Sequence, residues 1–300
     1  LGANNLTGTL PTEWSRMTGM HVLGLSINNF TGTLPTEWSK MTGMQTLTLS
    51  TNNFTGTLPT EWFTTWVNIS TMDLRDNLLT GTIPPIIFSH TNLAVLLITN
   101  NSFSGPLPTD LHKLSVLLAD RNKLSGTLPP TALHLRTLTL TGNRLAGSLP
   151  SKLFYPRVTQ VLLRGNDITG ALPVALASSP SLEFLDLSAN RLTGTLPPVW
   201  SSNATHVLLG ANQLGGTVPR RLVSVEGLKN LSLFSNDLSC KLQGTPPSGV
   251  EFDVLTGNAF ACLGPNDPFR RVDIFHSDYI CEWWRILNLS VFAGVVGAGK

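Results

Sequence analysis

Short runs of alternating apolar and polar residues recur along the whole chain and are clearest at its start. Residues 1–19, 23–44 and 47–62 are near copies that share the order Leu-x-Leu-x-x-Asn-x-(Leu/Phe)-x-Gly-x-(Leu/Ile)-Pro. The alternation predicts a short strand, and the Asn, Gly and Pro that follow predict turns. The word Pro-x-Glu-Trp, at Pro11, Pro35 and Pro59, predicts the first turn of a short helix.

The Asn of this pattern returns every 21 to 25 residues, at Asn4, Asn28, Asn52, Asn77, Asn101, Asn122, Asn143, Asn166, Asn190, Asn212, Asn236 and Asn258. This period is typical of leucine-rich repeats, in which each turn of a coil points its leucines inward and needs its neighbours to bury them. The Asn should lie at a tight bend and bond the backbone of adjacent turns. The fold class is therefore α/β: a leucine-rich-repeat solenoid with a parallel concave β-sheet and short helical or 3₁₀ turns on the convex side.

The resemblance to known families is more specific than the period. The words at residues 79–84 and 192–197 resemble the plant-receptor subclass of repeats, which implies a second strand beside the concave sheet and a twisted arc. Leu-Pro-Thr-Glu-Trp-Ser-x-Met-Thr, at residues 10–18 and 34–42, is similar to the kinetoplastid promastigote surface-antigen family. That resemblance implies a cell-surface glycoprotein used for binding, without catalysis.

The convex side should hold a stripe of large apolar side chains in the first three repeats. Trp14, Trp38 and Trp62 are in register, and Met17 and Met41 follow at helical spacing, which favours a core stripe over an aromatic ligand box. The repeats from Asn101 to Asn143 are about three residues shorter. We expect no convex helix of the same length there.

Composition and motifs argue against several classes of function. Charged residues make up 13% of the chain and the net charge is +2, so no overall basic field favours nucleic acid or anionic lipid. The six histidines share no metal-ligand or nucleophile spacing with Cys, Asp or Glu, and no H-E-x-x-H, C-x-x-C or G-x-S-x-G occurs. The sequence predicts no catalytic residues, no metal and no cofactor.

The pattern divides the chain into an array at residues 1–258, which begins inside a repeat without a cap, a C-terminal cap at 259–285 and a distinct tail at 286–300. The tail, ILNLSVFAGVVGAGK, fits the start of a membrane span whose remainder would follow Lys300, an extension of the cap, or part of a phosphate loop from Gly294 to Lys300. The phosphate loop would need a Ser or Thr after Lys300.

Two kinds of covalent modification are also predicted. Cys240 and Cys262 each stand four residues after a repeat Asn, and equivalent columns about 4.8 Å apart would allow a disulfide that seals the array. Two buried thiols, or a bridge between Cys262 and Cys281, are the alternatives. If the chain is secreted, glycosylation is expected at the Asn-x-Ser/Thr sites Asn5, Asn29, Asn53, Asn68, Asn100, Asn203 and Asn230, with a further sequon at Asn288.

The best functional signal lies in the strand positions that face away from the core. Four of these positions carry leucines that the core does not need, and charged and aromatic residues flank them. We expect a ligand surface on the second half of the concave face, formed by Leu162, Arg164, Phe184, Asp186, His206, Leu208 and Phe234. Relaxed patterning in diverged repeats is the competing explanation. The first three repeats show mostly Thr and Ser here and are expected to act as a spacer.

These observations favour a non-catalytic recognition ectodomain, at a cell surface or secreted, that binds protein or carbohydrate through its concave face. One alternative is the ligand-sensing part of a receptor whose enzymatic or nucleotide-binding domain lies beyond this chain. Another is a structural coat without a specific ligand.

Overall fold

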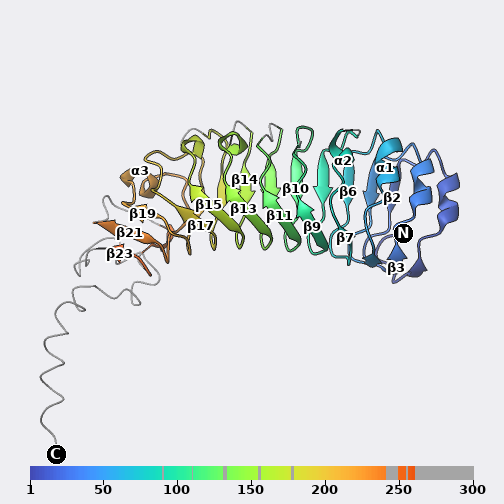
Figure 1. Ribbon diagram of the computed structural model, residues 1–300, viewed down its shortest axis with the longest axis horizontal. Helices are drawn as coiled ribbons and strands as arrows, with labels where there is room; N and C mark the ends of the chain where they lie inside the picture. Colours follow the sequence, from blue (N-terminus) through green and yellow to red (C-terminus); the bar gives the residue numbers. More distant parts are fainter. Residues whose placement is uncertain are drawn as a thin grey trace, which may run out of the picture.

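The chain folds into an elongated, arched stack of turns, with one repeat to each turn (Figure 1). The structure is a computed structural model and describes residues 1–89, 91–109, 111–130, 134–154, 157–176, 179–240, 249–254 and 256–260. Short strands lie side by side along the length of the array, and helical segments follow its outer rim. The predicted leucine-rich-repeat solenoid is confirmed.

The concave face is one parallel sheet, to which each turn after the first contributes a strand of three residues. In the described part of the chain this sheet has 11 strands. They are β2 (Val22–Gly24), β4 (Thr46–Thr48), β6 (Thr71–Asp73), β8 (Val95–Leu97), β10 (Val116–Leu118), β12 (Thr137–Thr139), β14 (Gln160–Leu162), β16 (Phe184–Asp186), β18 (His206–Leu208), β20 (Asn230–Ser232) and β22 (Glu251–Asp253). Equivalent residues of neighbouring turns are in register, as Leu117 is with Leu138.

A second set of parallel strands follows the turn, as the resemblance to plant-receptor repeats implies. It consists of β1 (Thr7–Thr9), β3 (Asn29–Thr33), β5 (Asn53–Thr55), β7 (Thr80–Gly81), β9 (Ser102–Pro106), β11 (Lys123–Thr127), β13 (Arg144–Ser148), β15 (Asp167–Ala171), β17 (Arg191–Thr193), β19 (Gly215–Gly216), β21 (Asp237–Cys240) and β23 (Ala259–Phe260). Its register is offset by two residues in each turn, so that Arg144 pairs with Ser125 and not with Lys123.

The predicted disulfide involves the last of the second strands. Cys240 ends β21 and pairs with Phe260 of β23. Cys262 and Cys281 lie outside the described residues, so the bridge itself stays a prediction.

The convex side carries short helices where the repeats are long. They are η1 (Thr12–Arg16), η2 (Thr36–Lys40), α1 (Thr60–Thr65), α2 (Ile86–Ser89), η3 (Ser151–Phe154), η4 (Val174–Leu176) and α3 (Arg220–Val223). η1, η2 and α1 each follow the Pro of Pro-x-Glu-Trp, as predicted. In the shorter turns the described residues between β9 and β12 form no helix, which agrees with the expectation from their length.

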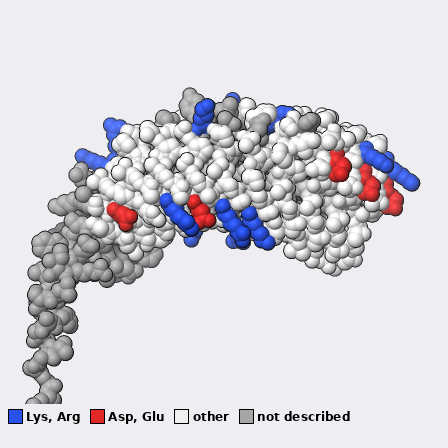
Figure 2. Space-filling model, in the orientation of Figure 1, with Lys and Arg blue, Asp and Glu red and all other residues white. Residues whose placement is uncertain are grey.

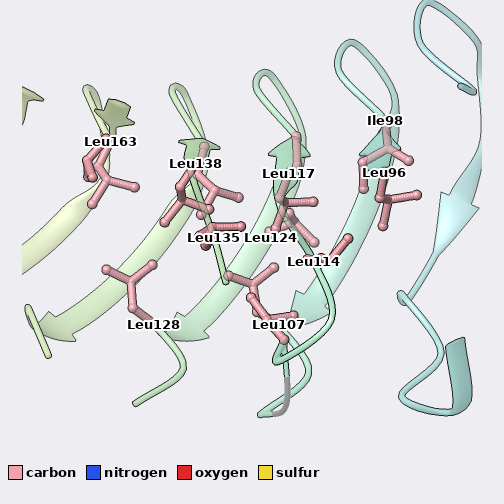
Figure 3. Close-up of a cluster of buried hydrophobic side chains, with 14 of the residues drawn as sticks. Leu96, Ile98, Leu107, Leu114, Leu117, Leu124, Leu128, Leu135, Leu138 and Leu163 are labelled. Atoms are coloured by element: carbon pink, nitrogen blue, oxygen red, sulfur yellow. The ribbon is translucent and has the colours of Figure 1, made fainter. Parts of the chain in front are cut away.

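The core is a continuous column of apolar side chains between the two sets of strands and the convex segments. The middle residue of each concave strand points into it, and Leu96, Leu117 and Leu138 are at most 1% exposed. Figure 3 shows these leucines meeting leucines from the second strands and the convex side. Each turn therefore completes the core of the next, which is why the period of the sequence predicts the fold.

Tryptophans extend this core on the convex side of the first turns. The rings of Trp14, Trp38 and Trp62 stack in order, with centroids 5.9 Å and 6.1 Å apart, and Trp66 stacks on Trp62. Trp38 and Trp62 are fully buried, and the indole N–H of Trp38 donates to the Pro11 carbonyl, 3.0 Å away. The predicted core stripe is confirmed for the tryptophans and for Met41, which is fully buried, whereas Met17 is 37% exposed and does not belong to it.

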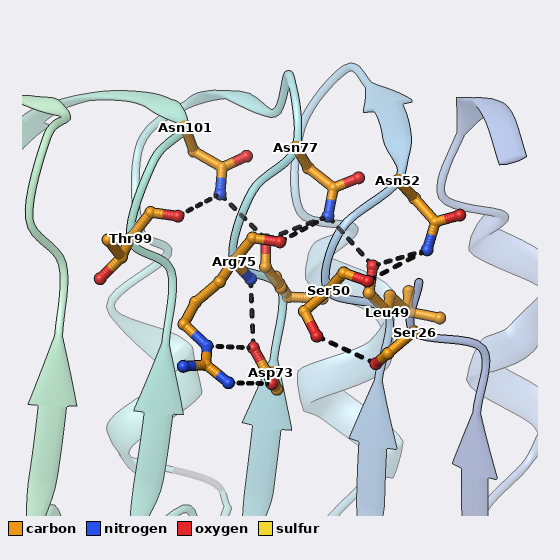
Figure 4. Close-up of polar contacts among 10 residues, drawn as sticks. Ser26, Leu49, Ser50, Asn52, Asp73, Arg75, Asn77, Thr99 and Asn101 are labelled. Carbon is orange, nitrogen blue, oxygen red and sulfur yellow. Dashed lines mark hydrogen bonds and ion pairs between the residues drawn. The ribbon is translucent and has the colours of Figure 1, made fainter. Parts of the chain in front are cut away.

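The repeat Asn forms the predicted ladder. The side-chain nitrogen of Asn77 donates to the Leu49 carbonyl of the preceding turn (3.0 Å) and to the Leu74 carbonyl of its own turn (3.2 Å), while its side-chain oxygen accepts from the Phe54 N–H (3.0 Å). Figure 4 shows the bonds that the side-chain nitrogens of Asn52, Asn77 and Asn101 donate. These buried amides bond backbone groups that the bend removes from both sheets, as buried polar groups must.

Several predictions fall on residues that the structure does not describe. Most of the predicted cap and the whole tail at 286–300 lie there, with the sequon at Asn288 and the phosphate-loop motif. Within the described residues, no helix has the length and apolar character needed to cross a membrane.

Candidate concave ligand surface

Each concave strand points its first and third residues away from the core, because side chains alternate along a strand. Matching residues of neighbouring strands therefore form rows across the sheet. The first row includes Phe184 and His206, which are in register, and the second row places Asp186 between Leu162 and Leu208. All five side chains are half-buried. They lie on the adjacent strands β14, β16 and β18, and we term them the concave cluster.

An aromatic stack forms one side of the concave cluster. The rings of Phe184 and His206 lie 4.5 Å apart and nearly parallel, at 12°. The hydroxyl of Thr205 is 2.9 Å from Nδ1 of His206. Partial burial, with a smaller contribution from the positive charge of Lys229, lowers the pKa of His206, whereas Glu251 acts in the opposite direction. The imidazole is therefore held toward its neutral form, which favours stacking on an apolar ring.

Asp186 gives the concave cluster a carboxylate between two leucines. Its Oδ1 accepts hydrogen bonds from the backbone N–H and the hydroxyl of Ser188. Among the described residues no donor bonds its Oδ2, so this oxygen is available to a ligand. The carboxylate is thus fixed in direction by its own turn while one acceptor faces solvent.

The two remaining predicted residues lie at the margin of the surface. Arg164 is exposed, two residues beyond the end of β14. The ring of Phe234 lies over Gly210, where an added Cβ would approach within 2.3 Å of it. The ring of Phe234 can occupy this position because Gly210 has no side chain. His206 is in register with Asn230, four residues before Phe234, so Phe234 lies about 13 Å further along the strand direction than His206.

Three residues of this surface were missed by sequence analysis. Asn230 is in register with His206 on the next strand, and its side-chain amide donates to Glu251 (2.9 Å). Lys229 precedes Asn230 and affects the pKa of His206. Asn230 occupies the same first position of its strand as Phe184 and His206, so the alternation that singles out those two also identifies Asn230.

Charged residues nearer the start of the array are already engaged within the protein. Arg75 donates two hydrogen bonds to the carboxylate of Asp73, at 2.9 Å and 2.8 Å, as Figure 4 shows. These bonds raise the pKa of the Arg75 guanidinium above its ordinary value. Asp120 accepts hydrogen bonds from the Thr139 hydroxyl (2.6 Å) and the Thr141 N–H (2.7 Å). The carboxylate with an available oxygen in the concave cluster is thus a better ligand contact than Asp73 or Asp120.

Among the described residues, no group of three or more His, Cys, Asp or Glu side chains is arranged to hold a metal ion. The concave cluster instead combines apolar, aromatic and charged groups on a rigid sheet, which suits recognition.

Comparisons with known proteins agree with the repeat architecture. Models of the leucine-rich repeat match residues 134–192, 68–90 and 92–114. A probable leucine-rich repeat receptor-like serine/threonine-protein kinase of Arabidopsis thaliana is 40% identical over 47 residues, which cover 16% of this chain and 5% of the kinase.

Solved ectodomains of plant receptors are similar over most of this chain. The plant peptide hormone receptor RGFR1, solved in complex with RGF2, has a TM-score of 0.72 and 30% identity, covering 86% of this chain and 47% of the solved receptor chain. The ectodomain of GASSHO1/SCHENGEN3 from Arabidopsis thaliana, solved with CASPARIAN STRIP INTEGRITY FACTOR 2, has a TM-score of 0.79 and 30% identity, covering 87% of this chain and 32% of the solved ectodomain chain. The chain thus spans less than half the length of these receptors and resembles their leucine-rich-repeat ectodomains.

Proposed function

We propose that this chain is a non-catalytic recognition module, part of a cell-surface or secreted protein, that binds an extended peptide segment of a protein ligand on its concave cluster. The observation that carries the proposal is the stacked pair of Phe184 and His206 beside Leu162, Asp186 and Leu208 on three adjacent strands. The similarity to receptors solved with the peptide hormone RGF2 and with CASPARIAN STRIP INTEGRITY FACTOR 2 supports a protein ligand.

Physical chemistry favours a peptide over a carbohydrate at this surface. The leucines offer an apolar patch that gains free energy by losing contact with water, at about 25 cal/mol per Å². The flat aromatic pair accommodates an apolar side chain, and the available Oδ2 of Asp186 accepts from a backbone N–H or a cation. A polyhydroxylated sugar would need more polar partners than these rows provide. The resemblance to the promastigote surface-antigen family adds a cell-surface setting and stays a prediction.

The test is selection of displayed random peptides on the immobilised protein, followed by affinity measurements with variants. Leu162→Ser, Phe184→Ser and Leu208→Ser, combined, should abolish binding of the selected peptides. The control is Leu97→Ser with Leu118→Ser, which removes two leucines from the second row outside the cluster. Thermal unfolding followed by circular dichroism verifies that both variants fold.

Two results would reject the proposal. Peptides that bind the folded triple variant as tightly as the wild type would show that the cluster is not their site. Failure to select any peptide, with the same outcome for folded protein ligands, would instead favour the structural coat.

A further inference from the structure

A cluster of cations lies along the edge of the array where the concave strands pass into the second strands. Its members share positions within three residues of a repeat Asn and are all exposed. We term them the basic ridge: Arg121, Lys123, Arg144, Arg164 and Arg191. Figure 2 shows Lys and Arg side chains gathered on the lower edge near the middle of the array, where Figure 1 places β11, β13 and β17.

The repeat geometry spaces these cations regularly. Lys123 and Arg144 begin β11 and β13, and the register offset makes them diagonal neighbours, about 7–8 Å apart. Arg121 has a left-handed backbone, with φ of 52°, and its Cγ lies 3.9 Å from where a Cβ on Gly142 would be. Its side chain therefore extends toward the next turn. Gly142 and Gly165 occupy the corresponding bends in the two turns that follow, so no side chain at those bends covers the ridge.

The nearby carboxylates neutralise only part of this charge. Asp167 pairs with Arg191, 2.7 Å apart, and both side chains are largely exposed. Asp120 bonds Thr139 and Thr141. Asp186 is a diagonal neighbour of Arg164, because Leu162 is in register with Asp186. Five cations against these three carboxylates leave a local charge of +2, as large as that of the whole chain. Within the described part of the chain, Arg121, Lys123, Arg144 and Arg164 form no ion pair.

The exposure of the ridge indicates what kind of anion fits it. A single solvated ion pair contributes at most about 1 kcal/mol, so a monovalent ligand would gain little here. A chain of anions gains more, because it contacts several cations at once and releases their counterions together. The ridge holds no aromatic side chain on which the bases of a nucleic acid would stack. It also offers no apolar row of the kind that anchors a peptide.

We propose that the basic ridge binds a linear polysaccharide bearing sulfate or carboxylate groups. Planar guanidinium groups bind the oxygens of such anions through paired hydrogen bonds, and Lys123 adds a point charge. This site is separate from the concave cluster, so the polysaccharide and the peptide ligand of the proposed function are bound by different side chains.

The test measures binding of heparin, as the sulfated probe, to the whole 300-residue chain. Lys123→Ser with Arg144→Ser should weaken binding by about 2- to 30-fold, as expected for two exposed ion pairs. It should also reduce the slope of log affinity against log salt between about 50 and 200 mM. Ser occupies the same position one turn earlier, at Ser102, so the change suits the fold. Arg220→Ser with Arg221→Ser on α3 removes the same charge elsewhere and should leave binding unchanged.

Three outcomes would overturn the proposal. If wild-type protein does not bind heparin at the lower salt, the ridge is not such a site. If both double variants weaken heparin binding equally, binding depends on the net charge of the protein and not on the basic ridge. If single-stranded DNA or polyglutamate of matched charge binds more tightly than heparin, the ligand class is wrong. The combined variant Leu162→Ser, Phe184→Ser and Leu208→Ser should fold and still bind heparin. Heparin binding by this variant would show that the ridge acts independently of the concave cluster, whether or not the peptide proposal holds.

Discussion

Asn143→Ala tests how much one rung of the ladder stabilises the array. The side chain of Asn143 is 8% exposed and forms three hydrogen bonds. Its nitrogen donates to the carbonyls of Ala119 (3.0 Å) and Leu140 (2.9 Å), and its oxygen accepts from the N–H of Leu124 (3.0 Å). Alanine replaces none of them. At about 0.5–1.5 kcal/mol for each net hydrogen bond, the free energy of unfolding should fall by about 2–4 kcal/mol.

The assay must allow for partial unfolding, because each turn contacts only its neighbours and arrays depart from two-state behaviour. Urea unfolding followed by circular dichroism measures the whole array. Amide hydrogen exchange then shows whether protection falls first at the N–H of Leu124 and Leu145, in the two turns that Asn143 joins.

The control is Asn203→Ala, which removes an exposed Asn with a single side-chain bond, to the Pro180 carbonyl at 2.7 Å. It should change the free energy of unfolding by about 0.5 kcal/mol or less. If Asn143→Ala destabilises the protein no more than this control, the ladder does not hold the turns together and the reasoning fails.

Three further predictions follow from the same structure. Trp38→Ala removes a fully buried ring from the stack and should destabilise the array by about 3–5 kcal/mol in thermal unfolding, and a loss below about 1 kcal/mol would contradict the packing argument. Burial lowers the pKa of His206 below its ordinary value of 6.5, so its folded form binds the proton less readily than the unfolded chain. Stability should therefore fall as the pH drops from above 6.5 through the folded pKa, and His206→Gln, measured by unfolding at several pH values, should lack this contribution. When the protein is expressed through a secretory pathway, mass spectrometry of glycopeptides should find glycan at Asn29, which is exposed, and little at Asn203, whose side-chain nitrogen bonds the Pro180 carbonyl. Glycan at Asn203 and none at Asn29 would contradict this prediction.

The sequence predicts the architecture well because the residues of each turn determine its strand, its bend and its buried face. Alternation specifies which residues face the core, and the position of Asn77 before a Gly and a Pro specifies the bend and its hydrogen bonds. The Trp38 stack follows equally from repeat identity. The offset of the second strands does not follow, because no residue type marks it.

The candidate site was only partly predictable for a similar reason. Alternation shows that Phe184 and His206 both face outward, but their stacking depends on side-chain torsions. Phe234 was grouped with them, although its ring lies over Gly210 at another level of the sheet. The basic ridge was missed because its five cations are spread over 70 residues and only three of them share a position, directly after the repeat Asn.

The contacts between turns bear on how the protein changes over evolutionary time. Each junction uses the same groups: a repeat Asn bonds a carbonyl one turn back, and Trp38 and Trp62 bond the carbonyls of Pro11 and Pro35. A block of 24 residues copied in frame brings both halves of that junction with it. Unequal recombination among the first three units thus adds or deletes whole turns while the core reforms. Selection can adjust the reach of this part of the molecule and leave the concave cluster unaltered.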